Sequence, residues 1–210
     1  MKRIFFFLVL GAAAWGQVNK NNDVQLWIGE ELTKKASSYC NAIFTNEWRI
    51  GNDITQLYHV YLQGLLDFKL HECFSMGPAY RQNWIRFDSK WREVYEPFFE
   101  TFFSKGRFFQ FRNRISYLMI ESAPNFWQYR TRIQFMGTWK FRSKALYPYV
   151  SGEFFVRSQM GLSQMRFTAG MSIPFMENFR GSFYYLLRYL NSDPHWTHQH
   201  ILGTWLRLNF

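Results

Sequence analysis

The sequence predicts an all-β protein, a single antiparallel transmembrane β-barrel, and three observations support this fold class. Long segments alternate polar and apolar residues with a period of two, the pattern of strands whose two faces meet different surroundings. Aromatic residues make up 21% of the 210 residues, more than one soluble domain of this size can bury. The last alternating segment ends on an aromatic residue, Phe210. A barrel with a lipid-facing wall accounts for all three.

The clearest strand is Phe126–Phe141. Its even positions are mostly polar from Gln128 to Lys140, and its odd positions are mostly apolar, with Trp127 and Trp139 near the two ends. The two tryptophans are twelve residues apart, which is roughly 40 Å of strand at about 3.3 Å per residue. Tilted by roughly 40°, such a strand covers about 30 Å along the membrane normal, close to the hydrocarbon thickness. We therefore expect the apolar face to meet lipid and the polar face to line a lumen.

The N-terminal residues 1–16 have the pattern of a secretory signal peptide. Lys2 and Arg3 form a short basic region, Ile4–Trp15 forms an apolar one, and Ala14 and Gly16 are the small residues that a signal peptidase requires. We expect cleavage before Gln17. The apolar run is too short to span a membrane comfortably, since a helix needs about 20 residues.

The first half of the barrel is expected to contain five strands, each with polar residues on the face that we assign to the lumen. Gly51–Asp53 and Ser104–Arg107 are turn signals between them. In the second strand we expect His59 to face the lumen and Tyr58 to face lipid. The fourth strand carries Pro97, which removes a ladder donor and fits only an edge or a bulge. The five predicted strands are Tyr39–Ile50, Leu57–Lys69, Phe74–Phe87, Trp91–Phe103 and Phe108–Ile120.

The second half is expected to contain five more strands, and parity decides the total. Bacterial single-chain barrels have even strand numbers, and a spanning Asp23–Leu32 would give an odd one. We therefore predict ten strands within residues 39–210, and a linker and rim or lumen segment within residues 17–38. Twelve strands, with one long segment split, is the alternative. The five strands are Phe126–Phe141, Tyr147–Arg157, Gln164–Ile173, Phe179–Asn191 and Thr197–Phe210.

The inward faces carry many arginines and fewer acids. The interior of a small barrel is nearly filled by side chains, and Arg–Glu pairs would cross-link it by bidentate bonds. We therefore expect a structural, plugged lumen, with Glu153 as the central acid and Arg132 as one of its partners. The alternative is a narrow anion-favouring pore, since rings of Arg and Lys select anions. The predicted lumen cluster contains the bases Arg81, Arg112, Arg114, Arg130, Arg132, Arg166, Arg180, Arg188 and Arg207, and the acids Glu47, Asp67, Glu96, Glu100 and Glu153.

Catalytic and metal sites are not expected, and the rival class of protein is an enzyme that acts on lipids. A lipid-modifying barrel enzyme would need a His–Ser pair on the outer wall. His198 and His200 fall on that face, but no serine is clearly matched to them. The run His195–His200 has ligand types for zinc or copper but no carboxylate or cysteine beside it, so we predict no metal and no cofactor. Cys40 and Cys73 are expected to be isolated thiols.

The formal net charge of +10 raises nucleic acid as a partner. The arginines, however, alternate with outward aromatics along strands and form no patch, so we expect no nucleic-acid binding. The predicted loops are short, which disfavours a receptor or an adhesin. The expected partners are outer-membrane lipid and the barrel-assembly machinery, which would read the C-terminal strand through Phe210. The expected state is a monomer in the bacterial outer membrane.

Several short motifs occur in an order that resembles a known family. They are a DxQLW-like segment (Asp23–Trp27), E-x-R (Glu47 and Arg49), Tyr80–Arg81, R-N-R (Arg112–Arg114), P-x4-E (Pro148 and Glu153) and the C-terminal Phe210. Together they resemble the uncharacterised bacterial outer-membrane barrels grouped as domain of unknown function 2490, over about Asp23 to Phe210. The resemblance implies a barrel fold and an outer-membrane location, and it implies no established activity.

Overall fold

The computed structural model describes residues 21–87, 90–106, 108–121, 123–141, 144–192 and 195–210. The expected signal peptide, residues 1–16, and its cleavage before Gln17 lie outside the described residues. In the described part of the chain no helix is long and apolar enough to cross a membrane. The strands are β1 (Asp23–Lys35), β2 (Cys40–Gly51), β3 (Gln56–His71), β4 (Phe74–Phe87), β5 (Lys90–Lys105), β6 (Phe109–Ile120), β7 (Phe126–Met136), β8 (Trp139–Phe141), β9 (Lys144–Arg157), β10 (Gly161–Met176), β11 (Phe179–Ser192) and β12 (His195–Asn209).

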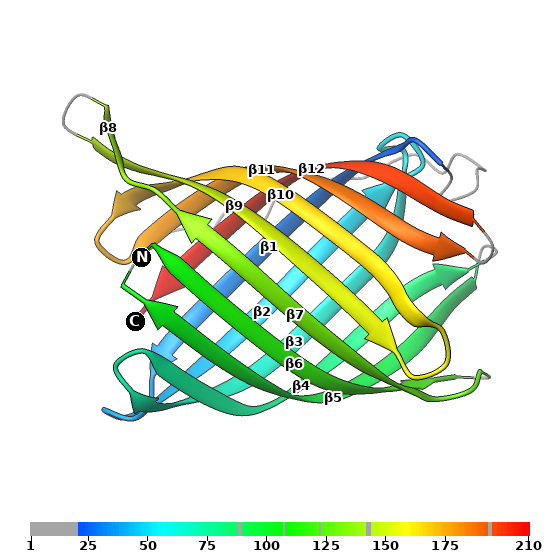
Figure 1. The fold of residues 1–210 in the computed structure, drawn as a ribbon, viewed down its shortest axis with the longest axis horizontal. Helices are drawn as coiled ribbons and strands as arrows, with labels where there is room; N and C mark the ends of the chain where they lie inside the picture. The colour runs from blue at the N-terminus through cyan, green and yellow to red at the C-terminus, as the bar shows by residue number, and fades with distance from the viewer. Residues whose placement is uncertain (1–20, 88–89, 107, 122, 142–143, 193–194) are drawn as a thin grey trace, which may run out of the picture.

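Eleven of these strands, all except β8, form a closed β-barrel (Figure 1). Consecutive wall strands pair antiparallel, and β7 pairs directly with β9. The barrel closes where β1 pairs with β12 in parallel, from Asp23 beside Gln199 to Thr33 beside Asn209. The prediction of a single β-barrel is therefore confirmed, while the strand count of ten is wrong.

The placement of β1 corrects the expectation for the N-terminal segment. Asp23–Lys35 is a wall strand between β12 and β2 and does not lie at the rim or inside the lumen. Its alternation is complete, with Val24, Leu26 and Ile28 on the outer face. A barrel without it would leave the edges of β2 and β12 with unpaired backbone groups, which are very costly in lipid. Because β1 pairs with both β2 and β12, the backbone groups of these two edges are hydrogen-bonded, and the wall has an odd number of strands.

The segment Phe126–Phe141 is split into two strands, β7 and β8. The twelve-strand alternative predicted that one long segment would split, but β8 is not part of the barrel wall. The break lies at Gly137, whose N–H donates to the Pro148 carbonyl over 2.8 Å. Beyond it β8 pairs only with the start of β9, and this hairpin projects past the end of the barrel (Figure 1). The sequence predicted that Trp139 lies near the second end of the same strand as Trp127. That prediction is wrong, because Trp139 lies in β8.

A bulge in β3 explains a second correction. The pairing with β2 shifts by one residue, so that Arg49 opposes His59 while Ile50 opposes Leu57. Tyr58 is the extra residue, and both Tyr58 and His59 are buried inside the barrel. Tyr58 was expected on the lipid face, but the bulge turns it inward.

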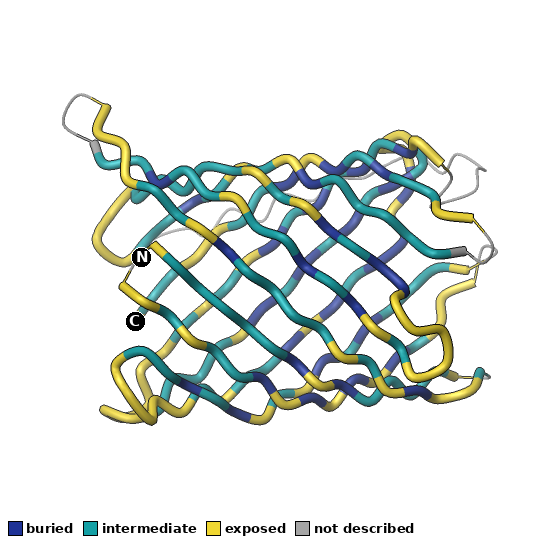
Figure 2. Tube along the Cα trace, viewed as in Figure 1, coloured by how far each residue is buried: buried dark blue, intermediate teal, exposed yellow. Residues whose placement is uncertain are grey.

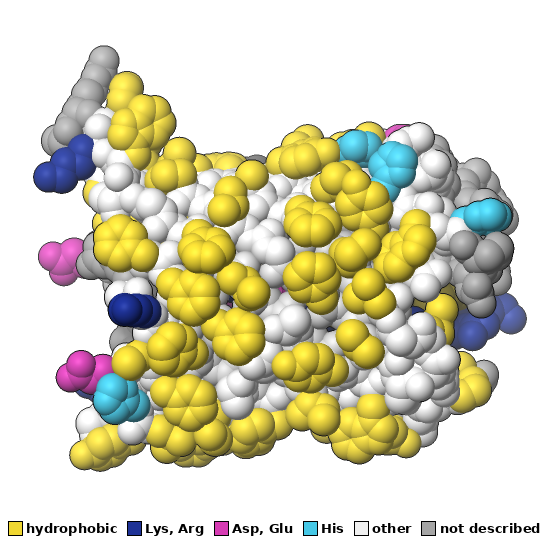
Figure 3. Space-filling model, in the orientation of Figure 1, with side chains coloured by type: hydrophobic (Ala, Val, Ile, Leu, Met, Phe, Trp, Pro, Cys, Tyr) yellow, Lys and Arg dark blue, Asp and Glu magenta, His cyan; other side chains and the backbone are white. Residues whose placement is uncertain are grey.

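The two faces of the wall differ in chemistry. Figure 3 shows hydrophobic side chains over much of the visible outer face, with lysines, arginines and acids gathered toward the two ends of the barrel. Examples of exposed outer residues are Phe44, Tyr80, Phe135 and Phe183. Figure 2 shows buried positions recurring along the strands between exposed ends. The buried set is mainly polar or charged, so this barrel is apolar outside and polar inside.

Glycines let large rings lie flat on the inner wall beside the parallel seam. A Cβ atom at Gly203 would overlap the Tyr184 ring, and one at Gly29 would overlap the Trp205 ring. The closing strands thereby hold a small apolar cluster that consists of Trp27, Leu186 and Ile201, with Tyr184 packed against it. The rest of the lumen holds mainly polar and charged residues, together with rings such as those of Phe98 and Phe155.

Candidate functional site: the charged lumen

Buried arginines alternate with aromatic rings around the lumen. The Arg49 guanidinium lies 3.9 Å from the Trp27 ring centroid, and the Arg81 guanidinium lies 4.3 Å from the Tyr61 centroid. Such cation–π contacts contribute about 0.5–2 kcal/mol each. We call this set the lumen belt. Its members are the arginines Arg49, Arg81, Arg114, Arg130 and Arg166, the acids Glu47, Glu96, Glu100 and Glu153, and the rings of Trp27, Tyr61, Phe98 and Phe155.

The lumen belt continues around the barrel from these contacts. Arg114 lies 3.8 Å from the Phe98 centroid, on the side of the belt formed by β5 and β6. Arg166 of β10 lies 4.6 Å from the Phe155 centroid and 5.0 Å from the Trp27 centroid. Trp27 therefore touches cations from both directions and joins the two ends of the belt across the parallel seam.

Carboxylates neutralise the belt on the β4–β6 side. Arg81 donates to Glu96 over 3.3 Å and also to the Gln63 side-chain oxygen over 2.6 Å. Arg114 donates to one oxygen of Glu100 through two nitrogens, over 2.8 and 2.6 Å. These pairs are deeply buried, and buried ion pairs need such multiple bonds to offset the loss of hydration.

Glu153 on β9 is the acid of the opposite side. Its two oxygens accept from Arg130 over 2.7 Å and from Arg166 over 3.2 Å. Arg132 lies directly opposite Glu153 in the β7–β9 register, yet it makes no hydrogen bond or ion pair with any described residue. The expected Arg132–Glu153 pair is therefore wrong, because the diagonal neighbour Arg130 and the next strand already occupy the carboxylate.

The Asp23–Trp27 motif ties β1 to the lumen belt. Gln25 donates to Asp23 over 2.7 Å and accepts from the Trp27 indole over 3.0 Å and from the Tyr58 hydroxyl over 2.8 Å. Asp23 also accepts the backbone N–H of Asp53 over 2.9 Å, which fixes the β2–β3 turn. The motif is thus a chain of buried hydrogen bonds along one strand face that holds the Trp27 ring in the belt.

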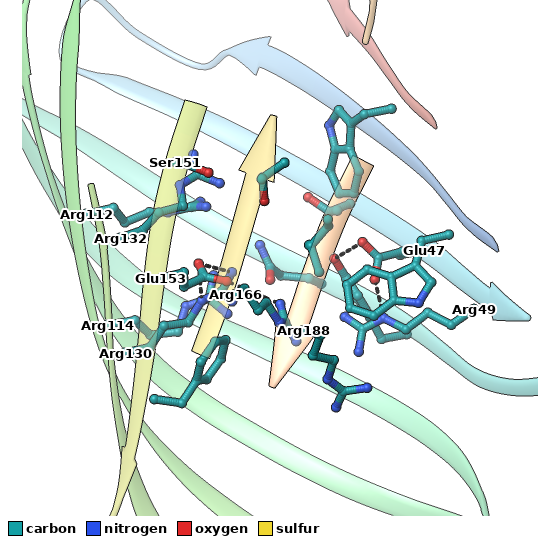
Figure 4. Close-up of a pocket in the computed structure, with 18 of the residues that line it drawn as sticks. Glu47, Arg49, Arg112, Arg114, Arg130, Arg132, Ser151, Glu153, Arg166 and Arg188 are labelled. Atoms are coloured by element: carbon teal, nitrogen blue, oxygen red, sulfur yellow. Dashed lines mark hydrogen bonds and ion pairs between the residues drawn. The ribbon is translucent and has the colours of Figure 1, made fainter. Parts of the chain in front are cut away.

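A cavity of about 1270 Å³ occupies the lumen. Its lining includes Arg86 and Asn191 near one end of the barrel, and Ser104 and Arg207 near the other. Side chains therefore leave open space toward both ends. Figure 4 shows how the belt and its neighbours project into this space from several strands.

All nine arginines of the predicted basic cluster line this cavity. Arg188 donates to Gln164 over 3.1 Å and to Gln199 over 3.1 Å. Arg180 lies over the Tyr147 ring at 5.8 Å, and the half-exposed Arg207 pairs with Glu31 over 2.6 Å near the rim. Arginines of the same predicted cluster thus have very different partners.

The predicted acids divide into belt members and one outlier. Glu47, Glu96, Glu100 and Glu153 are buried in the lumen belt. Asp67 is half-buried near the end of β3, and it is not among the described residues that line the cavity. Glu47 pairs with Arg49 over 2.5 Å, within the E-x-R motif.

Sequence reasoning left several lumen residues out of its cluster. Arg49 and Arg157 line the cavity, and the inward rings of Trp27, Phe98 and Phe155 complete the belt. Their parity along the strands could have found them, since each follows the inward alternation of its own strand. Arg49 and Arg157 were omitted although alternation had placed them on the inner face, and the rings of Phe98 and Phe155 were missed because aromatic residues were assigned to lipid by type.

The histidines on the outer wall have aromatic partners. His200 forms a hydrogen bond of 2.6 Å with the Tyr185 hydroxyl, and His198 lies 6.2 Å from the Tyr189 ring centroid. Among the described residues no three His, Cys, Asp or Glu side chains gather closely enough to hold a metal ion. Cys40 and Cys73 are free thiols.

Phe210 has an exposed side chain and a paired backbone. Its N–H donates to the Thr33 carbonyl over 2.9 Å, and its carbonyl accepts from Lys35 over 3.2 Å. The C-terminal residue therefore extends the parallel seam by its main chain and leaves its ring on the surface.

Comparison with known proteins gives a family and no characterised relative. A search of the curated proteins finds no match. One family's sequence profile matches residues 24–199, which is most of the chain and nearly the whole of the barrel. The match agrees with the resemblance seen in the short motifs. The chain therefore belongs to the family described as protein of unknown function (DUF2490).

Proposed function

We propose that this protein is a monomeric β-barrel of the bacterial outer membrane, with a structural role and a lumen that the belt closes to solutes. The apolar outer wall supports the membrane location, because only a barrel that faces lipid exposes so many large hydrophobic side chains. The charged residues at the two ends suit the lipid headgroup regions. In this proposal the protein carries no catalytic group, cofactor or nucleic acid.

The observation that carries the closed lumen is the burial of the belt's charged residues. Its four acids and the arginines Arg49, Arg81, Arg114 and Arg166 are between 3% and 9% exposed. Charged side chains that line a wide aqueous channel would touch the water inside it. Charges this deeply buried are bonded to one another, as in a cross-linked plug.

Conductance in a planar bilayer tests this function. Purified wild-type protein that shows a β-rich circular dichroism spectrum and heat-modifiable gel migration should give no steady current. A Glu153→Gln variant should give measurable current, because Arg130 and Arg166 lose their shared acceptor and the belt loosens. Steady current from the wild type would contradict the closed lumen, and a helical spectrum would contradict the fold.

A narrow anion-favouring pore is the second candidate, and the cavity of about 1270 Å³ favours it. Its lining holds more arginines than acids, which would attract anions. Reversal-potential measurements in a salt gradient separate the two proposals. Anion selectivity that falls in an Arg130→Gln and Arg132→Gln double variant with an intact fold would establish the pore.

We also propose that the assembly machinery of the outer membrane reads the C-terminal strand through Phe210. Deleting Phe210 should lower the amount of assembled barrel in the membrane far more than it lowers the stability of refolded protein. The reason is that its ring is exposed and packs little, although its backbone is paired. Heat-modifiable protein in membrane fractions is the readout, and normal levels of the truncated chain would contradict the proposal.

A further inference from the structure

Two arginines in the lumen face each other without enough carboxylate to neutralise them. Arg112 on β6 and Arg132 on β7 are direct cross-strand neighbours. Side chains at such positions start about 4.5–5.5 Å apart, and like charges there repel. Arg112 makes one long contact, 3.5 Å to Glu100, and Arg132 makes no hydrogen bond or ion pair with any described residue. Figure 4 shows the two side chains reaching into the lumen together.

The polar side chains beside this pair are also uncommitted. Gln110, Gln134 and Ser151 form the next cross-strand row, on the same face of β6, β7 and β9. All three line the cavity, and none of them has a side-chain hydrogen bond with a described residue. Figure 4 places Ser151 at the level of the two guanidinium groups. Two cations, two amides and a hydroxyl therefore converge on open space.

From this arrangement we propose that Arg112 and Arg132, with Gln110, Gln134 and Ser151, bind the phosphate group of a small solute. Each guanidinium presents a planar fork of donors that fits two oxygens of a phosphate. Two such forks match a dianion in charge, and the amides and the hydroxyl can donate to its remaining oxygens.

The carboxylates of the neighbourhood make their short bonds to other arginines, and only Glu100 contacts this pair, over 3.5 Å to Arg112. Glu153 gives both oxygens to Arg130 and Arg166, and Glu100 gives its short bonds to Arg114. A phosphate would therefore supply the missing negative charge and relieve the repulsion between Arg112 and Arg132. The proposal deepens the lumen assignment, but it requires only that one end of the lumen admits the solute. Binding and conduction are thus separate properties.

Phosphate binding to the purified full-length barrel in detergent tests the site. Isothermal titration with inorganic phosphate should give saturable binding to the wild type. Arg132→Gln should weaken the affinity by about tenfold or more, the effect of losing one charge-assisted interaction of about 1.4 kcal/mol. Arg132→Lys, which keeps the charge and loses the fork, should lie between the two. The matched control is Arg180→Gln, which removes the same charge from the same lumen and should change the affinity by less than about twofold.

The outcomes separate a built site from a diffuse field. Equal weakening by Arg132→Gln and Arg180→Gln would overturn the proposal, because it would show only the general charge of the lumen. Absence of saturable binding by both inorganic phosphate and glycerol 3-phosphate would also overturn it. Tighter binding of one of these two probes would support the site and identify its source as free phosphate or a phosphate ester. Bilayer current is recorded on the same samples, so a failure of the closed-lumen proposal is seen independently.

Discussion

Two pairs of arginines on the same two strands have opposite surroundings. Arg114 opposes Arg130 across β6 and β7, and Arg112 opposes Arg132 one step along the same face. The first pair is held by carboxylates, Glu100 over 2.6 Å and Glu153 over 2.7 Å. In the second pair only Arg112 has a contact with an acid among the described residues, 3.5 Å to Glu100. The difference lies in which arginines the acids of the flanking strands β5 and β9 bond to. Glu100 directly opposes Arg114 and bonds to it. Glu153 directly opposes Arg132, yet its oxygens bond to Arg130 and Arg166.

Arginines in the same lumen can therefore have either a structural role or a binding role. An arginine whose donors are occupied by buried acids cross-links neighbouring strands and is closed to ligands. An arginine two residues away, with the same backbone geometry, keeps its donors for a solute. Which arginine the nearby acids bond to decides which of these two roles that arginine has.

The largest expected effect comes from removing the acid that holds the first pair. Glu153→Gln leaves Arg130 and Arg166 without their carboxylate in a buried setting, which should cost about 3–5 kcal/mol in the free energy of unfolding. Urea unfolding of the barrel in detergent micelles, followed by tryptophan fluorescence, measures this loss.

A matched control is Glu31→Gln at the rim. Its partner Arg207 is 46% exposed, so the pair should contribute only about 0–1 kcal/mol. Equal destabilisation by the two variants would show that the belt pairs are no stronger than rim pairs.

A smaller effect is expected from giving the second pair an acid of its own. Ser151→Glu places a carboxylate beside Arg132, in the row next to it on β9. The new pair should stabilise the barrel by about 1 kcal/mol, the usual order for one hydrogen bond to a charged group. It should also abolish phosphate binding, because the carboxylate occupies the same donors. If the Ser151→Glu variant is stabilised but keeps its affinity for phosphate, Ser151 is not part of the phosphate site.

The smallest effect has the opposite sign to the first. Arg132→Gln removes one of two repelling charges and breaks no described ion pair, so without phosphate it should leave stability unchanged or raise it by about 0.2–1 kcal/mol. The same substitution at Arg130 should destabilise, because it removes the donor to one of the two oxygens of the buried Glu153. Urea unfolding of both variants in phosphate-free buffer makes the comparison. A loss of more than about 1 kcal/mol in Arg132→Gln would mean that its guanidinium already has a partner.

The strands of the barrel wall could be predicted from the sequence more completely than the contacts inside the lumen. Alternation predicted Phe74–Phe87 with the bounds that β4 has, and it predicted most other wall strands with differences of one to three residues at their ends. Phe126–Phe141 is the exception among them, because the wall strand β7 ends at Met136. The prediction for Asp23–Lys35 was wrong because the rule that bacterial barrels have even strand numbers was given more weight than the alternation of polar and apolar residues in this segment. Alternation failed at Tyr58 because a one-residue bulge changes the face of a side chain without changing the residue types.

Which arginine meets which acid could not be predicted from alternation. The pattern places Arg130, Arg132 and Glu153 on the inner face, but it does not tell direct neighbours from diagonal ones. Glu153 bonds to the diagonal Arg130 and to Arg166 on the next strand, while Arg132 opposite it stays apart. Side-chain length and competition between strands decide this, and both depend on the closed barrel.

The parallel seam places the two ends of the barrel wall at opposite mouths of the barrel, which in the proposed membrane setting are opposite sides of the membrane. Because β1 and β12 run in the same direction, Asn22 before β1 and Asn209 at the end of β12 lie at opposite mouths of the barrel. Cys40 and Cys73, beside the β1–β2 and β3–β4 connections, share the mouth of Asn209. A cysteine placed at Asn22 and the two native thiols would therefore report on opposite compartments to a reagent that cannot cross the membrane. In a barrel with an even number of strands, both ends of the wall would lie in one compartment. Labelling of these cysteines would therefore show whether the number of wall strands is odd or even.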